Sequence, residues 1–591
     1  MIRFFSVTAF LLLCISQCFG QQLYNLPDLK VGKYSSNSVG IIDSEPNTGN
    51  SVSGGFNSNL PIVIIDTKGQ VIPDGTKITA QLKVINHGSG IMNQSTDTTY
   101  EYNGFIGIEI RGHFSTTFPQ KSYGIETRDS NGDNLNVSLL GMPKENDWIL
   151  IPNYDDKSFA RNVISFDLFR NMGHYATRAR LCEVILNSEY HGIYVFSEKI
   201  KPDKNRLNIP KMTGDDKSGT ALTGGYIISV DYTSATDSWT SSYPPYNYPD
   251  RQVQYNYVNP KPADIIAEQK KYIQKFIKDA EGALYGKSFT NPAIGYSKYV
   301  DVPSFIDYFI LSEVSRNVDG YKKSRYFFKN RDDKDSLLNA GPVWDFDWAW
   351  KNITECIFGN TDGSGWGYKT NDCQASYAVP DWHIKLLQDG NFTNRLIDRY
   401  KELRSGLLDL NKINKFIDSI RIEVKDAKER HFALYPISDA NAAPEVEPPS
   451  KTYDEEIAKL KEWIRIRILW LDINIPKLTE NIKINFTRTE VTNSQLKPNS
   501  FSLSQNYPDP FNPSTRIRYS LPVNCNVTLK IYDVLGREIV TLVNGFKYAG
   551  EYEVTFTAEN LFNNAQLTSG TYFYQIVAGE FRRTGKMIFI K

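Results

Sequence analysis

The sequence predicts an α+β protein, with a large mixed domain followed by a small all-β domain. Apolar and polar residues alternate early in the chain, as in 78–85 and 104–110, which is the pattern of half-buried strands. Helical spacing takes over later, and from Tyr453 to Ile475 apolar residues recur every three or four positions. Beyond residue 500, short alternating segments return between turn residues, with the spacing of a β-sandwich.

The first 20 residues predict a signal peptide. Arg3 gives a positive start, and residues 4–15 are almost entirely apolar, which is the length of a signal sequence and too short for a membrane helix. Small residues at Cys18 and Gly20 place cleavage before Gln21. The alternative is a buried N-terminal strand. We expect the chain to be exported from the cytoplasm.

Four further segments follow from composition. Residues 21–59 are rich in Ser, Asn, Gly and Pro and predict a loosely ordered lead-in. The large domain is expected over 60–476, where a β-rich half precedes a helix-rich half, the layout of a two-lobed enzyme with a cleft. Residues 477–499 predict a linker, and 500–591 a separate sandwich. No stretch after the leader has the roughly 18 apolar residues of a membrane helix.

Charge and cysteine content exclude several classes of partner. The 67 basic and 67 acidic side chains balance and are interspersed, so nothing favours a nucleic acid or an anionic membrane. The chain has no C-x-x-C pair, which argues against a cysteine metal site. Cys356 and Cys373 flank a Gly-rich loop and could pair in an oxidising compartment. That pairing stays open from sequence alone.

The C-terminal tail carries a specific resemblance. Residues 505–515 read QNYPDPFNPST, 531–537 read IYDVLGR and 569–572 read SGTY. This series resembles the type A C-terminal sorting domain of the type IX secretion system, although Asp509 replaces the commoner asparagine. The resemblance implies a sandwich over 500–591 that binds the outer-membrane secretion machinery, in a Gram-negative bacterium related to the Bacteroidetes. The alternative is an ordinary sandwich that adds mass or binds a ligand.

The central region, from about 60 to 475, resembles the CotH kinase family. No single motif is specific, but their number, order and spacing are. The motifs are IEIRG at 108–112, PQKSYGIE at 119–126, LGMP at 140–143, DW at 147–148, DK at 156–157 with RN at 161–162, YHGIY at 190–194 with EK at 198–199, GGYI at 224–227, Glu313, NVDGY at 317–321 and PVWDFD at 342–347.

The resemblance implies an atypical, bilobal kinase-like fold with ATP and Mg²⁺ as cofactors. Phosphoryl transfer needs a cation on the phosphates, carboxylates for metal and a carboxylate near the accepting hydroxyl. On this basis Lys121 would hold phosphates. Asp319, which precedes an expected strand at 325–329, would be the catalytic base. Asp345 would bind magnesium with Asp347 assisting, because Mg²⁺ prefers hard oxygen ligands.

Two further residues complete the implied site, and one departs from it. Arg111 is a candidate for phosphate binding, and Glu198 for holding Lys121. Arg111 and Arg161 could instead form structural ion pairs with Glu109, Glu126 or Asp156, and the sequence slightly favours that reading. Ser324 stands where kinases place the asparagine that binds a second metal, so a second metal is in doubt.

Each proposed role also has a simpler explanation. A lysine such as Lys121 on a strand is usually a solvated side chain. Asp319 precedes a glycine, and Asp-Gly is a common turn. Asp345 could cap a short helix. The motif series favours the functional reading of all three residues.

Three hypotheses about function follow. The first is a secreted or cell-surface kinase that transfers the γ-phosphoryl group of ATP to a protein Ser or Thr. The second is a non-catalytic structural or adhesive surface protein that keeps the fold, which agrees with Ser324 and with the scarcity of ATP outside the inner membrane. The third is a hydrolase of extracellular polymers, which would need a carboxylate pair in a sugar-sized groove.

Overall fold

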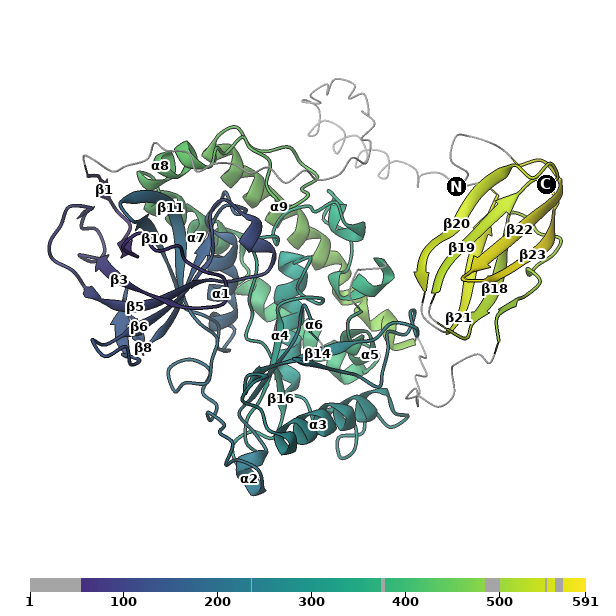
Figure 1. Cartoon of the computed structure of the whole chain (residues 1–591), viewed down its shortest axis with the longest axis horizontal. Helices are drawn as coiled ribbons and strands as arrows, with labels where there is room; N and C mark the ends of the chain where they lie inside the picture. Colours follow the sequence, from purple (N-terminus) through teal and green to yellow (C-terminus); the bar gives the residue numbers. More distant parts are fainter. Residues whose placement is uncertain are drawn as a thin grey trace, which may run out of the picture. The chain divides into compact units, whose positions relative to one another are not determined.

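A computed structural model describes the protein over seven stretches of the chain. They are residues 55–234, 236–373, 378–483, 500–523, 525–547, 550–558 and 567–591. The predicted signal peptide, most of the lead-in and most of the linker lie outside these residues. The described chain is α+β with an all-β C-terminal region (Figure 1), which confirms the predicted fold class at that level.

A closed β-barrel forms the first part of the large domain. Its strands follow the order β10-β11-β9-β6-β5-β3-β2, and a parallel pairing of β10 with β2 closes it. Alternate side chains fill the interior, including fully buried Leu82, Ile108 and Trp148. The strands are β2 (Ile62–Asp66), β3 (Ile78–Ile85), β5 (Tyr102–Ile110), β6 (Tyr123–Arg128), β9 (Asp147–Pro152), β10 (Ala179–Leu186) and β11 (Glu189–Glu198).

A five-stranded sheet follows the barrel, with the order β13-β14-β12-β15-β16. From the sequence we predicted only one strand of this sheet, at 325–329, and we expected this half of the large domain to be rich in helices. The strands are β12 (Tyr226–Val230), β13 (Ser238–Thr240), β14 (Gln254–Asn259), β15 (Arg325–Lys329) and β16 (Leu338–Ala340). Small pairings outside these sheets join β1 (Asn57–Ser58) to β4 (Asn93–Gln94) and β7 (Val137–Leu139) to β8 (Met142–Glu145).

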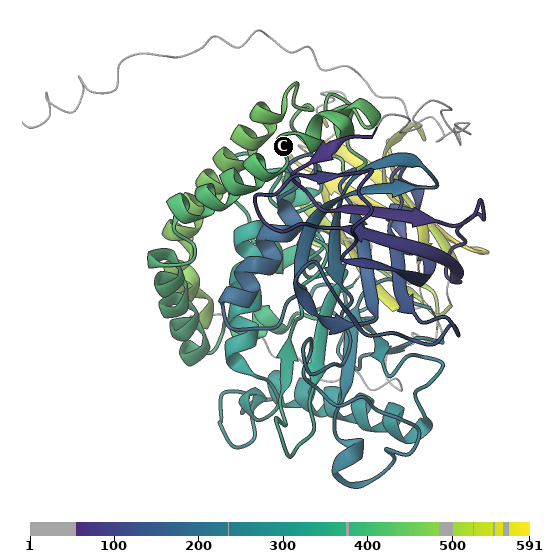
Figure 2. The ribbon, with the colours of Figure 1, turned by 90° about the vertical axis from the view of Figure 1, so that its left-hand side faces the viewer.

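Helices pack around this sheet and share its large hydrophobic core. Helix α4 (Val302–Ser315) is buried along nearly its whole length, while α9 (Tyr453–Asn474) begins at the predicted residue with a capping box from Thr452 and Glu455. The helices of residues 390–474, drawn in green, run along one side (Figure 2). The others are α1 (Arg161–Asn171), α2 (Gly219–Leu222), α3 (Ala267–Tyr285), α5 (Trp382–Leu386), α6 (Gly390–Ser405), α7 (Leu410–Glu423) and α8 (Ala427–Leu434).

The C-terminal region forms two antiparallel sheets around a separate core. One sheet has the order β17-β18-β21 and the other β20-β19-β22-β23. These strands agree with the short alternating segments predicted beyond residue 500. They are β17 (Ser502–Leu503), β18 (Ser514–Leu521), β19 (Cys525–Tyr532), β20 (Glu538–Lys547), β21 (Gly550–Thr557), β22 (Gly570–Ala578) and β23 (Phe581–Phe589).

A disulfide bond joins Cys356 to Cys373, which settles the pairing that the sequence left open. It links the short 3-10 helices η3 (Cys356–Gly359) and η4 (Gly367–Cys373). Across the described ranges, none of the helices combines the length and the apolar character needed to cross a membrane.

Candidate functional site

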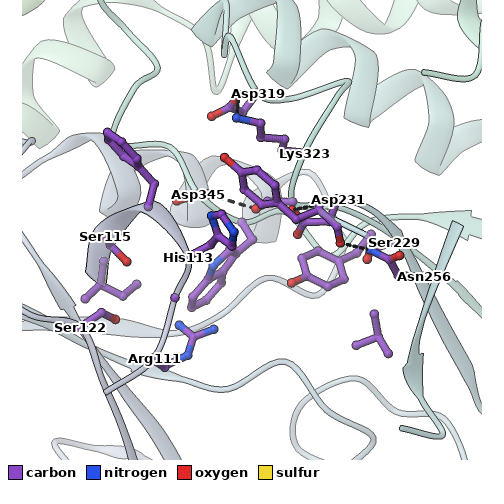
Figure 3. A pocket seen from close by; sticks show the side chains of 18 of the residues that line it. Arg111, His113, Ser115, Ser122, Ser229, Asp231, Asn256, Asp319, Lys323 and Asp345 are labelled. Carbon is purple, nitrogen blue, oxygen red and sulfur yellow. Dashed lines mark hydrogen bonds and ion pairs between the residues drawn. The ribbon is translucent and has the colours of Figure 1, made fainter. Parts of the chain in front are cut away.

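A cavity of about 820 Å³ opens between the end of barrel strand β5 and the inner strands β12, β14 and β15 of the five-stranded sheet. Both parts contribute to its wall, as does the segment 344–348. Figure 3 shows Asp319, Lys323, Asp345 and Asp231 gathered across the cavity from Ser115 and Ser122. The charged or ionisable lining residues are Arg111, His113, Asp231, Tyr232, Asp237, Tyr257, Asp319, Lys323, Tyr326, Asp345 and Asp347.

Asp319 lies in a tight turn that begins where α4 ends. The helix stops at Arg316, whose φ of 42° is left-handed. Asn317 Oδ1 then accepts a hydrogen bond from the Asp319 N–H at 3.1 Å, which shapes the turn. Burial raises the pKa of Asp319, and the cations of Lys322 and Lys323 oppose that shift. The carboxyl is therefore a better proton acceptor than an ordinary aspartate.

Asp345 and Asp347 place two acids side by side. Asp345 has a left-handed φ of 68°, an uncommon conformation for a residue other than glycine. The side chain of Asn317 donates to the Asp345 carbonyl at 3.0 Å, and Ser324 Oγ donates to Asp345 Oδ2 at 3.1 Å. Burial and then the neighbouring Asp345 carboxylate raise the pKa of Asp347 well above its usual range. Ser324 thus contacts the predicted metal residue directly.

Asp231 is a site residue that the sequence analysis missed. It follows the last residue of β12 and lines the cavity. Burial raises its pKa to about 6, and the negative charges of Asp345 and Asp319 add to the shift. Its signal was an acid directly after the apolar strand that begins at the GGYI motif, but only the sheet pairing brings that strand end to the cavity.

Arg111 brings a cation to the cavity from the end of β5. Its guanidinium lies over the Trp344 ring, 5.7 Å from the centroid. The structural ion pair favoured from sequence is absent among the described residues, because Glu109 and Glu126 both lie against Lys77, at 3.7 and 3.2 Å. Arg111 is therefore a cation on the cavity wall that no described carboxylate neutralises.

Lys323 is a second cavity cation that the sequence analysis did not select. Its Nζ lies 3.9 Å from Asp319 Oδ1 and 4.7 Å from the centroid of the Tyr232 ring. The predicted base and a cation therefore share one part of the cavity wall.

Lys121 and Glu198 do not line the cavity. Lys121 Nζ donates to the carbonyl of Thr116 at 2.8 Å, in the short turn η1 (Phe114–Thr117). Glu198 is fully buried and pairs with Arg178 at 2.8 Å. The structure therefore brings the predicted acids together, but it does not bring Glu198 to Lys121 or Lys121 to the acids.

Arg161 has the structural role that the sequence favoured for it. Its guanidinium is buried and contacts Asp156 Oδ1 at 2.6 Å and Glu456 Oε1 at 2.9 Å. Asp156 also accepts the backbone N–H of Arg161 at 2.8 Å. These contacts fasten the start of α1 to α9, and none of the three side chains lines the cavity.

Taken together, the fold and site define an α+β protein with an acid-lined cavity and an all-β C-terminal domain. The family model described as CotH kinase protein matches residues 108–471, which include every residue that lines the cavity. The chain belongs to the CotH kinase family. A second family model, described as secretion system C-terminal sorting domain, matches residues 505–591, so the chain carries a type IX sorting domain. No curated protein matches the chain.

Proposed function

We propose that this protein is a CotH-type kinase that acts outside the cytoplasm and transfers the γ-phosphoryl group of ATP to a Ser or Thr of a protein. The observation that carries the proposal is the cavity that gathers Asp319, Asp345 and Asp347 with Arg111. In the proposal, the barrel and the following α/β part correspond to the two lobes of a kinase-like arrangement.

Asp319 is the proposed general base. A base near the accepting hydroxyl removes its proton as the new P–O bond forms. Burial raises the pKa of Asp319, so its affinity for that proton exceeds that of a solvated aspartate. The cations of Lys322 and Lys323, the latter with its Nζ 3.9 Å from the carboxylate, oppose that shift and favour the ionised form.

Asp345 and Asp347 are the proposed magnesium residues. Among the described residues, no group of three or more acids, histidines or cysteines could hold a metal without other ligands. Mg²⁺ commonly uses one or two carboxylates together with phosphate and water oxygens. The Asp345 carboxylate raises the pKa of the adjoining Asp347, and two such neighbouring carboxyls fit that donor set. A bound Mg²⁺ would neutralise charge on the phosphates.

Arg111 is the proposed phosphate cation, with Lys323 beside the base. The aspartates Asp231, Asp237, Asp319, Asp345 and Asp347 outnumber these two cations on the wall. A free polyphosphate would be repelled by such a lining. The proposal therefore predicts that nucleotide enters only with a divalent cation.

The C-terminal domain supports the extracytoplasmic part of the proposal. A type IX sorting domain over 505–591 implies contact with that secretion machinery and supports secretion or a cell-surface location. The signal peptide proposed over 1–20 would bring the chain across the inner membrane first.

The test is phosphate transfer by the purified full chain. We expect incorporation of labelled phosphate from ATP into a Ser/Thr-rich acceptor protein with Mg²⁺ and none with a chelator. Asp319→Asn and Asp345→Asn should each reduce the rate by at least about 100-fold, the range of general acid–base and electrostatic contributions. Asp333→Asn is the matched control, because this exposed aspartate pairs with Arg331 and does not line the cavity.

Two results would contradict the proposal. If phosphate transfer continues in both Asp319→Asn and Asp345→Asn, these residues do not have the roles assigned to them. Absence of both transfer and nucleotide binding in the unmodified chain would favour the non-catalytic surface protein instead.

A further inference from the structure

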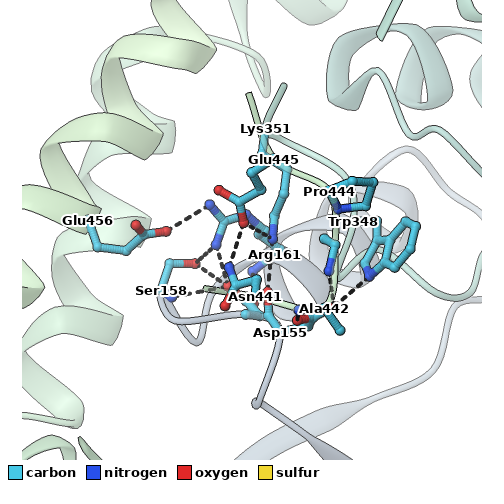
Figure 4. A network of polar contacts seen from close by, with 12 residues as sticks. Asp155, Ser158, Arg161, Trp348, Lys351, Asn441, Ala442, Pro444, Glu445 and Glu456 are labelled. Atoms are coloured by element: carbon cyan, nitrogen blue, oxygen red, sulfur yellow. Dashed lines mark hydrogen bonds and ion pairs between the residues drawn. The ribbon is translucent and has the colours of Figure 1, made fainter. Parts of the chain in front are cut away.

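Asp155 is a buried acid that the proposed chemistry does not use. It lies just after β9 and is 1% exposed. Its Oδ2 accepts hydrogen bonds from Trp348 Nε1 at 2.7 Å and from the Ala443 N–H at 3.0 Å. Its Oδ1 accepts from the Ala442 N–H at 2.6 Å. One carboxylate thus joins three segments far apart in sequence (Figure 4).

Trp348 links this carboxylate to the cavity. The indole lines the cavity wall one residue after Asp347. Its ring meets that of Phe114 edge to face, with centroids 5.7 Å apart and an interplanar angle of 85°. Phe114 also lines the cavity but belongs to the η1 turn of the barrel. The orientation of the Trp348 ring therefore determines how the segment 344–348 contacts the barrel at the cavity wall.

The backbone near Trp348 is fastened at a second point. Lys351 Nζ donates to the Asp155 carbonyl at 2.8 Å and to Glu445 Oε1 at 2.8 Å. The chain between Asp345 and Lys351 is thus held at Trp348 and again at Lys351. Without the first contact, the indole could rotate about its side-chain torsions, because those torsions have several accessible minima.

We propose that Asp155 is a positioning residue of the cavity, which acts through Trp348 by fixing the indole against Phe114 as the wall of the ligand site. A charge-assisted hydrogen bond is strong enough to select one ring orientation. The ligand part of this inference rests on the proposed function, whereas the wall itself does not depend on any ligand.

The first test is a double-mutant cycle on the affinity of the full chain for Mg²⁺-ATP, measured by calorimetry. Asp155→Asn and Trp348→Phe should each weaken binding about tenfold, the loss expected for one charge-assisted bond. If Asp155 acts through Trp348, the double variant should also be about tenfold weaker. A double variant about 100-fold weaker, or single variants that bind normally, would overturn the proposal.

Trp350→Phe is the matched control. It makes the same replacement two residues further on and removes the bond from Trp350 Nε1 to Ser165 Oγ at 2.9 Å. Trp350 does not line the large cavity. We expect its affinity for Mg²⁺-ATP to remain within about twofold of the unmodified chain, since its contacts end in the core.

The second test needs no ligand and separates this inference from the proposed function. Hydrogen exchange of the free chain should quicken in peptides covering 112–118 and 344–350 for both Asp155→Asn and Trp348→Phe. Trp350→Phe should leave 112–118 unchanged. Unchanged exchange at 112–118 in both variants would refute the positioning role even if nucleotide binds. Failure of the unmodified chain to bind nucleotide would refute the kinase proposal alone.

Discussion

The surroundings of Arg161 and the wall of the cavity use the same residue types in opposite ways. Arg161 is buried between Asp156 and Glu456, at 2.6 and 2.9 Å. Arg111 lies on the cavity wall over an aromatic ring, with no described carboxylate in contact. Both arginines come from motifs of the same series. The difference lies in their partners, which identify the first as structural and the second as available to a ligand.

The acids of the two regions differ in the same way. Burial opposes ionisation of Glu456, but Arg161 and Lys459 overcome it and lower its pKa. Burial raises the pKa of Asp347, and its nearest neighbour Asp345 raises it further. A compensated acid stabilises the fold, whereas an uncompensated acid costs stability until a cation or a proton arrives. The predictions below separate these two cases.

The largest expected effect is on Arg161. Arg161→Met should lower the free energy of unfolding by about 3–5 kcal/mol, because Asp156 and Glu456 would remain buried without their cation. Arg111→Met should change it by less than about 1 kcal/mol, as expected of a side chain with no ion pair to lose. Urea unfolding of the full chain measures both. Equal losses would remove the distinction between the regions.

Ionisation of Asp231 should lower the stability of the folded chain, so its effect should depend on pH. Its pKa is raised to about 6, so the folded state releases this proton at a higher pH than the unfolded state. The stabilising contribution of Asp231 to the free energy of unfolding is therefore fully present below about pH 4, and it is lost as the pH rises through 6. With a chelator present, Asp231→Asn should stabilise the chain by about 2 kcal/mol at pH 7.5 and by almost nothing at pH 4.

Asp237 is the control for Asp231, with the opposite sign. Hydrogen bonds from Thr236 and Ser234 lower the pKa of Asp237, so its carboxylate adds stability above its ordinary pKa. Asp237→Asn should therefore destabilise the chain at pH 7.5 rather than stabilise it. The same sign for both variants in thermal unfolding would contradict the account of the cavity acids.

Asp347 should show a smaller effect that depends on metal. Without divalent cations, Asp347→Asn should stabilise the chain at pH 7.5 by about 1 kcal/mol, since a neutral group relieves the unfavourable pair with Asp345. Added Mg²⁺ should raise the Tm of the unmodified chain more than that of the variant. A metal effect of the same size in both would exclude Asp347 as a ligand.

Lys121 should show the smallest effect on the site. Its ammonium donates to the Thr116 carbonyl rather than facing the cavity. Lys121→Met should weaken Mg²⁺-ATP binding by less than about threefold, and Arg111→Met by about tenfold or more, the loss expected for a charged contact to phosphate. Calorimetric titration decides between them. The reverse order would restore Lys121 as the phosphate residue.

Local patterns predicted much of the fold. The strand at 78–85, the strand at 325–329, the start of α9 and the sandwich strands are all read from short-range periodicity or capping. The five-stranded sheet was not predicted as a sheet. β13 and β16 have only three residues each, and β12 reaches β15 by a pairing nearly 100 residues distant, which no local pattern records.

The candidate site was predictable in part for a related reason. Asp319 stands in the turn that follows the recognisable helix α4, and Asp345 lies within the PVWDFD motif, so local sequence carried the placement of both. Asp231 depends on the pairing of β12, and Lys121 on the direction of one side chain just before β6. The spacing of residues along a strand determines neither the strand pairing nor the direction of the Lys121 side chain. The same limit made Arg111 and Arg161 look alike in the sequence.

The disulfide bond has a practical consequence for anyone who prepares this protein. Cys356 follows Glu355, which contacts the ammonium group of Lys322 beside Asp319. A reducing bacterial cytoplasm leaves such thiols unjoined. Recombinant batches made there would differ from exported material in the crosslink next to the turn that carries Asp319. Thiol titration before any assay, or production in an oxidising host, would keep rates from different laboratories comparable.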